Sequence, residues 1–160
     1  MTKSGQPPRM REELIAPCGM NCNVCAAYQA LTHDLRDKGV RIPYCPGCRP
    51  RKKSCAFLKK KCDLIGKDRV KYCYECSTFP CDRLVTLDRR YRERYRMSEI
   101  ENLERIRDEG MRAFLKSEEK KWACPRCGGI KSCHNGLCFD CDLRVLKDKK
   151  KVYRWDDGED

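Results

Sequence analysis

The chain has 160 residues, enough for one ordinary domain or two small ones, and 15 of them are cysteines. Hydrophobic residues make up 40% of the chain with the cysteines included, charged residues make up 38%, and the mean hydropathy is -0.81. This composition excludes a large apolar core and a membrane span, so cysteine chemistry is the expected source of the missing stability.

The first residues contain no apolar run of the kind that forms a signal peptide, which predicts a cytoplasmic protein with no membrane partner. Thiols stay reduced in the cytoplasm, so cysteine pairs separated by two residues indicate metal ligands rather than disulfides. The odd number of cysteines favours the same interpretation.

The formal net charge of +12 is typical of proteins that bind nucleic acids or other polyanions. Metal binding would moderate it, because four thiolates around one divalent ion carry a charge of about -2. Three such sites would lower the net charge to about +6. The surface is therefore expected to stay positive.

The first cysteines, Cys18, Cys22 and Cys25, follow residues 1–12, which are polar, rich in proline and expected to be disordered. Apolar residues recur every three or four positions from Asn23, which predicts a helix that ends near Gly39. His33 lies off this apolar stripe and is expected at the surface.

Further cysteines follow in the same half of the chain. Cys45 and Cys48 form a metal-binding knuckle with a glycine in its turn, and Cys55 and Cys62 lie in an expected short helix or turn. Residues 71–84 are the last cysteine-containing stretch of this half, and in them Cys73 and Cys76 form another knuckle. Cys81 is expected just inside a helix that begins at Pro80.

That helix is predicted to run to about Arg96. Ser98 and Glu101 have the spacing of a capping box, so a second helix is expected from there to about Lys120, interrupted at Gly110. Beyond it, two knuckles separated by ten residues predict a zinc ribbon. Its ligands are Cys124, Cys127, Cys138 and Cys141, and the neighbouring Cys133 and His134 remain alternatives as ligands.

These motifs resemble the cysteine-rich family called domain of unknown function 3795. The resemblance rests on the cysteines of residues 18–25 and 45–48 and on Tyr-Cys-Tyr-Glu-Cys-x3-Pro-Cys-Asp-Arg-Leu in residues 72–84. Residues 101–110, 122–129 and 134–141 are similar to the family as well. The resemblance implies metal binding and carries over no activity.

The candidate metal ligands comprise every cysteine except Cys133. They are Cys18, Cys22, Cys25, Cys45, Cys48, Cys55, Cys62, Cys73, Cys76, Cys81, Cys124, Cys127, Cys138 and Cys141. We expect about three zinc ions, with an iron–sulfur cluster as the alternative to one zinc in the N-terminal half. One grouping puts the first three cysteines with Cys73, Cys76 or Cys81, and Cys45 and Cys48 with Cys55 or Cys62.

The expected fold is α-rich with a small α+β character and is stapled by metal. Its parts are a disordered N-terminus (1–12), a cysteine-rich metal-binding domain (13–96), a helical connector (97–121), a zinc ribbon (122–145) and a charged tail (146–160).

The expected function is that of a structural-zinc binding or interaction module with a protein or polyanion partner. Three basic segments, 49–53, 59–61 and 89–96, favour non-specific binding of nucleic acid, and Tyr91 and Tyr95 could stack on bases unless they pack inward. With two histidines the chain offers little for acid–base catalysis, so an enzyme is disfavoured but left open. The competing hypothesis is an iron–sulfur redox or sensor protein.

Overall fold

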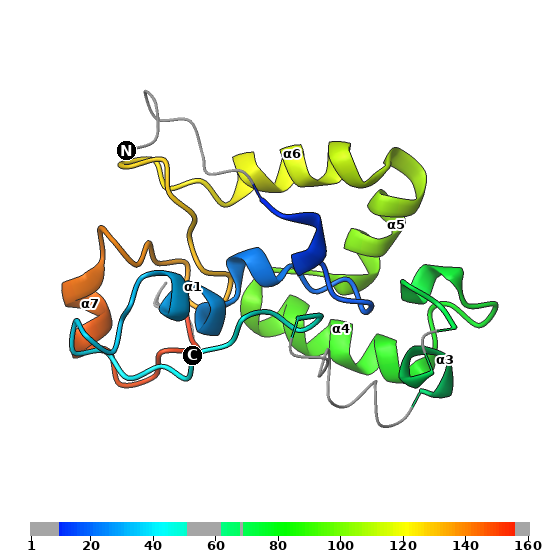
Figure 1. Ribbon diagram of the computed structural model, residues 1–160, viewed down its shortest axis with the longest axis horizontal. Coiled ribbons are helices and arrows are strands. Elements are labelled where there is room, and N and C mark those ends of the chain that lie inside the picture. The colour runs from blue at the N-terminus through cyan, green and yellow to red at the C-terminus, as the bar shows by residue number, and fades with distance from the viewer. Residues whose placement is uncertain (1–9, 51–61, 68, 156–160) are drawn as a thin grey trace.

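The computed structural model describes residues 10–50, 62–67 and 69–155, and it is mostly helical (Figure 1). Its helices are α1 (Ala26–Thr32), α3 (Asp63–Gly66), α4 (Asp82–Tyr95), α5 (Glu99–Glu109), α6 (Met111–Lys121) and α7 (Leu143–Asp148). Single turns of 3-10 helix occur at η2 (Glu12–Leu14), η3 (Cys22–Val24) and η4 (Cys73–Glu75). The described residues form isolated β-bridges and no strand, so the expected α+β character is wrong.

The first α-helix is shorter than the sequence predicts. Residues 22–24 form the 3-10 turn η3, in which the side-chain oxygen of Asn21 accepts a hydrogen bond of 3.0 Å from the amide of Asn23. Cys25 then has an extended backbone, so α1 begins at Ala26 and ends at Thr32. The cysteine knuckle therefore replaces the first helical turn that the apolar spacing predicts.

A buried carboxylate fixes the corner between α4 and α5. Asp88 of α4 accepts hydrogen bonds from the Ser98 hydroxyl (2.6 Å) and the Ile100 amide (3.0 Å). It also forms an ion pair with Arg92 at 2.7 Å. The hydroxyl of Ser98 accepts from the amide of Glu101, so the predicted cap at Ser98 is confirmed.

Two predicted helix boundaries shift slightly. Cys81 is the residue that precedes α4 rather than one inside it, since the helix begins at Asp82. Gly110 has a φ of +94° and separates α5 from α6, where the chain turns sharply (Figure 1). The predicted interruption is thus a break between two helices.

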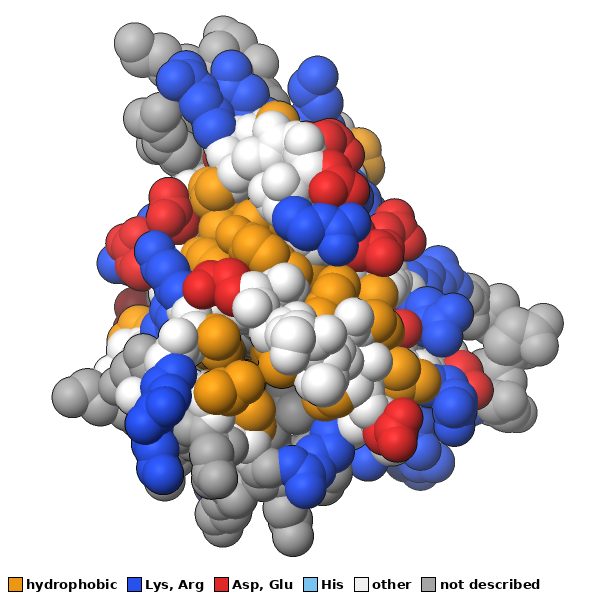
Figure 2. All heavy atoms as spheres, turned by 90° about the vertical axis from the view of Figure 1, so that its right-hand side faces the viewer, with side chains coloured by type: hydrophobic (Ala, Val, Ile, Leu, Met, Phe, Trp, Pro, Cys, Tyr) orange, Lys and Arg blue, Asp and Glu red, His pale blue; other side chains and the backbone are white. Residues whose placement is uncertain are grey.

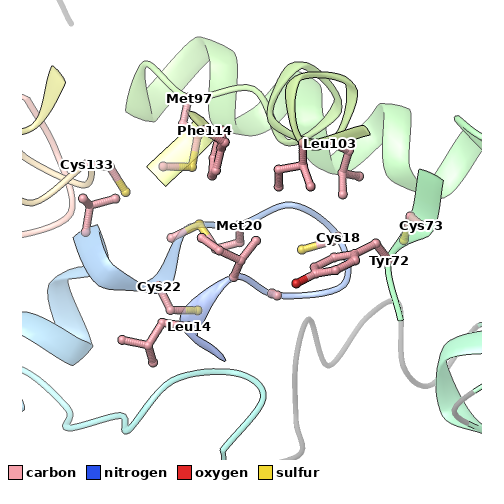
Figure 3. Close-up of a cluster of buried hydrophobic side chains, with 14 of the residues drawn as sticks. Leu14, Cys18, Met20, Cys22, Tyr72, Cys73, Met97, Leu103, Phe114 and Cys133 are labelled. Atoms are coloured by element: carbon pink, nitrogen blue, oxygen red, sulfur yellow. The ribbon is translucent and has the colours of Figure 1, made fainter. Parts of the chain in front are cut away.

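The main core forms where the N-terminal segment lies against α4, α5 and α6 (Figure 3). Its fully buried side chains include Leu14, Ile15, Cys18, Val24, Leu84, Leu103, Phe114 and Cys133. Gly19 has a φ of +92°, and a side chain there would collide with the carbonyl oxygen of Glu99. The same close approach lets the side-chain amide of Asn102 donate to the Gly19 carbonyl at 2.9 Å.

A second, smaller core joins α1 to the last part of the chain. It consists of Ala26, Ala30, Leu35, Val40, Ile42, Phe139 and Leu146. Phe139 comes from the predicted ribbon and Leu146 from α7, so the ribbon is packed against the N-terminal segment. The helix predicted between Cys55 and Cys62 lies outside the described residues, as do the segments 51–53 and 59–61 and most of the N-terminus predicted to be disordered.

A carboxyl group in the main core lacks a hydrogen-bond partner among the described residues. Both carboxyl oxygens of Glu99 are buried and unbonded there, and the residue has no exposed surface. Burial, and then the nearby carboxylate of Asp88, raise the pKa of Glu99 to about 9. Glu99 is therefore protonated at neutral pH.

We expect Glu99→Gln to stabilise the protein increasingly as the pH rises. The pKa of Glu99 in the folded chain exceeds the ordinary 4.5, so the folded state holds an extra proton between these values and loses stability as the pH rises through them. Urea unfolding between about pH 6 and about pH 8 should show the variant gaining about 1–3 kcal/mol over the native chain. Glu104→Gln, an exposed change on the same helix, should show no such trend.

Candidate metal centre

The first knuckle of the centre follows directly from α6. The buried Trp122 ends that helix, and its indole N–H donates to the Glu118 carboxylate at 3.3 Å. The Cys124 amide then donates to the Gly129 carbonyl (2.6 Å), and the Gly128 amide to the Cys124 carbonyl (2.8 Å). These bonds close a tight turn, for which Gly128 supplies a φ of +77°.

The second knuckle is held against the first by Asp142. Its carboxylate accepts from the Cys138 amide at 2.9 Å, and its own amide donates to the Cys138 carbonyl at 2.8 Å. The other carboxylate oxygen binds the guanidinium of Arg126, from the first knuckle, at 2.6 Å. One side chain therefore supports both halves of the site, as residues around a metal's ligands commonly do.

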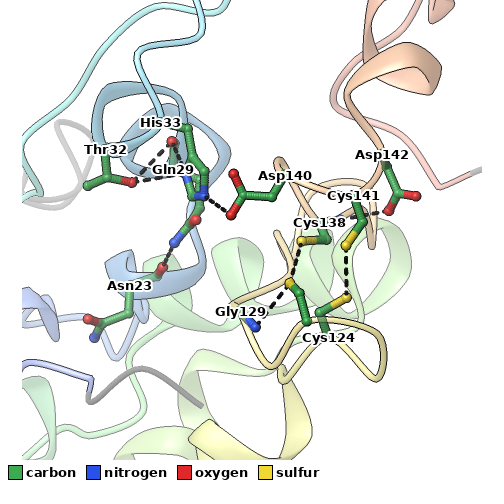
Figure 4. Close-up of polar contacts among 11 residues, drawn as sticks. Asn23, Gln29, Thr32, His33, Cys124, Gly129, Cys138, Asp140, Cys141 and Asp142 are labelled. Atoms are coloured by element: carbon green, nitrogen blue, oxygen red, sulfur yellow. Dashed lines mark hydrogen bonds and ion pairs between the residues drawn. The ribbon is translucent and has the colours of Figure 1, made fainter. Parts of the chain in front are cut away.

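The four sulfurs of Cys124, Cys127, Cys138 and Cys141 all lie within 4.8 Å of one another. The Cys124 and Cys141 sulfurs are 3.9 Å apart, and the Cys127 and Cys138 sulfurs 3.6 Å (Figure 4). Zinc–sulfur bonds of about 2.3 Å in a tetrahedron place sulfurs about 3.8 Å apart. The group therefore has the dimensions of a shell around one tetrahedral ion.

Backbone amides favour ionisation at the turn of the first knuckle. Burial opposes ionisation of Cys124, but hydrogen bonds from the amides of Cys127 and Arg126 and from the thiols of Cys138 and Cys127 together outweigh it and lower its pKa to about 7. Burial raises the pKa of Cys138 to about 12. A metal ion would displace these protons, since thiolates are the ligands it binds.

Cys133 and His134 do not belong to this group of sulfurs. Cys133 is fully buried in the main core. The Nδ1 atom of His134 accepts a hydrogen bond from the Ala26 amide at 3.1 Å, and burial lowers the pKa of this histidine to about 4. His134 is thus a neutral side chain that joins the ribbon to the start of α1.

The N-terminal cysteines are grouped differently from the sequence-based expectation. Cys22 and Cys25 lie near Cys45 and Cys48, with the Cys48 amide donating to the Cys22 sulfur at 3.5 Å. A hydrogen bond with the Cys48 thiol and burial raise the pKa of Cys22, and burial raises that of Cys25 to about 11. Cys22 and Cys25 therefore lie with Cys45 and Cys48 rather than with the cysteines of residues 73–81, whereas Cys18 lies near Cys73 as the predicted grouping has it.

A different set surrounds Cys73, whose amide donates to the Pro17 carbonyl at 2.8 Å. Burial, and then the nearby thiols of four other cysteines, raise the pKa of Cys73. These four are Cys18, Cys62, Cys81 and Cys76. Cys55 lies outside the described residues.

Two contacts that support the metal centre were not predicted from the sequence. The position of Asp142, four residues after Cys138 and directly after Cys141, was a weak indication in the sequence that it supports the site. His33 is half-buried rather than fully exposed, and its Nε2 atom lies 3.4 Å from a carboxylate oxygen of Asp140 between the last two ligands (Figure 4). Nothing in the sequence indicates that His33 and Asp140 are in contact.

The basic residues are divided between structural and exposed positions. Arg49 donates to the carbonyls of Ile15 and Lys71, both at 2.6 Å, so it supports the N-terminal loop. Tyr91 and Tyr95 pack edge-on against His134, with ring centroids at 6.0 and 4.6 Å. These tyrosines therefore pack inward, which was the alternative to stacking on bases.

The comparison with protein families gives a match over residues 14–86, to the family described as protein of unknown function (DUF3795). Residues 14–86 are a domain of this family. The match confirms the resemblance for the N-terminal cysteines, whereas the similarity noted for residues 101–141 lies beyond it and stays a prediction. No match was found among curated proteins or solved structures. In the described residues no helix has the length and apolar character needed to cross a membrane.

We predict that Cys138→Ala removes one metal ion, while Cys133→Ala removes none. Both thiols are buried to within 1% of full burial, so each change deletes a similar side chain from the interior. Only the first deletes a candidate ligand of the centre, where metal binding would be coupled to folding. Metal content per chain by native mass spectrometry measures the difference, and an unchanged content in Cys138→Ala would contradict the assignment.

Proposed function

We propose that this chain is a zinc-stapled binding or scaffolding module, with a structural zinc held by Cys124, Cys127, Cys138 and Cys141. The observation that carries the proposal is the sulfur spacing of 3.6 and 3.9 Å. Four protein ligands complete a tetrahedral shell and leave no open position for a substrate or water. A closed shell of this kind is typical of structural zinc rather than catalytic zinc.

The same spacing favours a single ion over an iron–sulfur cluster at this centre. In a cluster the four cysteines are divided among two or four irons that sulfide ions bridge, so sulfurs on different irons stand further apart than around one ion. Among single ions, zinc is favoured because a tetrahedral four-thiolate site suits it and it needs no redox partner.

The proposed zinc would stabilise a region that has no regular secondary structure of its own among the described residues. Residues 123–142 form isolated bridges and short turns, and their regular secondary structure begins only at α7. An ion that joins both knuckles would fix their relative position, as Asp142 does from outside the shell. The ribbon then presents a rigid surface to a partner.

Anaerobically purified protein should contain zinc, be colourless and lack acid-labile sulfide. Elemental analysis and the visible absorption spectrum measure these properties. Zinc in the native chain that is lost in Cys138→Ala would support the proposal. Iron and sulfide that are lost in the same variant would instead assign a cluster to this centre and overturn it.

We further propose that the partner is a polyanion, bound weakly and without sequence preference. Arg89, Arg90 and Arg94 are exposed on α4, whereas Arg92 is paired with the buried Asp88. The inward packing of the two tyrosines leaves charge rather than base stacking as the source of affinity.

Neutralising Arg89, Arg90 and Arg94 to Gln should weaken the salt dependence of binding to single-stranded nucleic acid. Each phosphate contact contributes about 0.7 to the slope of log affinity against log salt, so the slope should fall by up to about 2. Fluorescence anisotropy with a labelled oligonucleotide measures it. The matched control neutralises Arg112, Lys116 and Lys120, three exposed residues of α6, and an equal effect there would show that only net charge matters.

A further inference from the structure

The knuckle at Cys22 and Cys25 has the backbone geometry of a metal-binding turn. The Cys25 amide donates to the Cys22 carbonyl at 3.1 Å, which closes the 3-10 turn η3. After the Cys48 thiol and burial, the Cys25 thiol also lies close enough to raise the pKa of Cys22. The amides of Ala27 and Tyr28 also donate to the sulfur of Cys25. The ribbon sulfurs of Cys124 and Cys138 likewise accept from amides two and three residues further on.

The knuckle at Cys45 and Cys48 is docked onto this turn. The Cys45 amide donates to the Ala27 carbonyl at 3.2 Å, in the first turn of α1. The Cys48 amide donates to the Cys22 sulfur at 3.5 Å, and the thiols of these two residues are hydrogen-bonded. Gly47 between them has a φ of +113° and packs against Leu14. Two knuckles thus face each other, as in the ribbon.

The second set of cysteines surrounds a small cavity. Cys62, Cys73, Cys76 and Cys81 line a space of about 30 Å³, and the other lining residues are Leu64, Ile65, Val70, Phe79 and Leu84. The buried Cys18, the fifth thiol near Cys73, does not line this space and is therefore left out of the set. A space of this size holds about one water molecule or a single ion. It lies in the part of the chain around α3, on the face where Figure 2 shows hydrophobic side chains gathered between basic and acidic ones.

The knuckle in this cavity repeats the turn found at Cys22. The Cys76 amide donates to the Cys73 carbonyl at 3.0 Å, which closes η4, and the residue after the turn is again an extended cysteine. The backbone angles of Cys25 (φ −72°, ψ 135°) and Cys76 (φ −81°, ψ 138°) are nearly equal. Cys81 approaches from the start of α4 and Cys62 from the start of α3.

We propose that the N-terminal domain holds two single metal ions, one bound by Cys22, Cys25, Cys45 and Cys48 and one by Cys62, Cys73, Cys76 and Cys81. The alternative to metal binding is that these thiols only pack in the core. Packing in the core explains why the thiols are buried. It does not explain why η3 and η4 have the same turn geometry or why the knuckle at Cys45 faces the knuckle at Cys22. The sulfurs are less tightly gathered than in the ribbon, whose four thiols alone form a mutual group within 4.8 Å among the described residues. Binding would draw each set together.

The ligands on the two ions are thiolates, so zinc is the ion we expect at both. Each ion would displace protons from its four thiols and form metal–sulfur bonds without any change of oxidation state. This proposal goes beyond the ribbon zinc, because its residues and variants are separate from those of the ribbon.

The test counts metal in variants of the full chain purified without oxygen. Cys48→Ser and Cys76→Ser change half-buried ligands, one from each set, so both should still fold. We expect about three zinc ions per native chain, about two in each single variant and about one in the double variant by native mass spectrometry. The buried Cys133→Ala again serves as the control that keeps all of them.

A second measurement on the native chain guards against a folding defect in the variants. Cys45, Cys48 and Cys76 should resist alkylation while metal is bound and react once a chelator is added, as mapped by peptide mass spectrometry. Equal reaction rates with and without the chelator would overturn the proposal. A native chain with about one zinc, a disulfide joining Cys22 and Cys48, or iron and sulfide lost in the N-terminal variants would overturn it too. The Cys138→Ala result stands independently of these outcomes.

Discussion

The buried backbone of residues 17–26 is hydrogen-bonded to three distant parts of the chain, and the arrangement of the cysteine sets depends on these bonds. The Cys73 amide donates to the Pro17 carbonyl, and the Cys133 amide to the Val24 carbonyl, both at 2.8 Å. On the helical side, the Asn102 side chain reaches the Gly19 carbonyl. A buried peptide group that loses its partner costs about 1–3 kcal/mol, so this segment cannot move without disturbing all three contacts.

The same segment explains how the ribbon is tied to the N-terminal domain. His134 lies between the two ribbon knuckles in the chain and contacts the start of α1, where it accepts from the Ala26 amide and packs against Tyr95 and Tyr153. Its pKa of about 4 keeps it neutral and therefore compatible with an apolar site. Trp155, the last described residue, covers this junction, because its indole N–H donates to the Cys133 carbonyl at 2.8 Å and Arg96 stacks on its ring at 3.9 Å.

The chain has few apolar residues, and its interior accordingly contains buried carboxyl groups. Three carboxyl groups, those of Asp88, Glu99 and Glu118, are at least 98% buried. Asp88 and Glu118 are satisfied by hydrogen bonds and ion pairs that connect helices to loops, whereas Glu99 is protonated. A chain with 38% charged residues thus uses buried polar contacts and sulfur in positions that larger proteins fill with hydrocarbon.

The sequence by itself determined the local features, which depend on neighbours in the chain. The Ser98 cap, the break at Gly110 and each of the two ribbon knuckles follow from residues a few positions apart, where spacing limits the geometry. The expected α+β character is not found in the described residues, because the ribbon there forms single bridges rather than strands. Only the tertiary structure decided that Cys22 lies with Cys48 rather than with Cys73, since equal thiols at equal spacings carry no information about their partners. That choice is made by the packing of residues 17–26 against distant helices, which fixes where each knuckle can point.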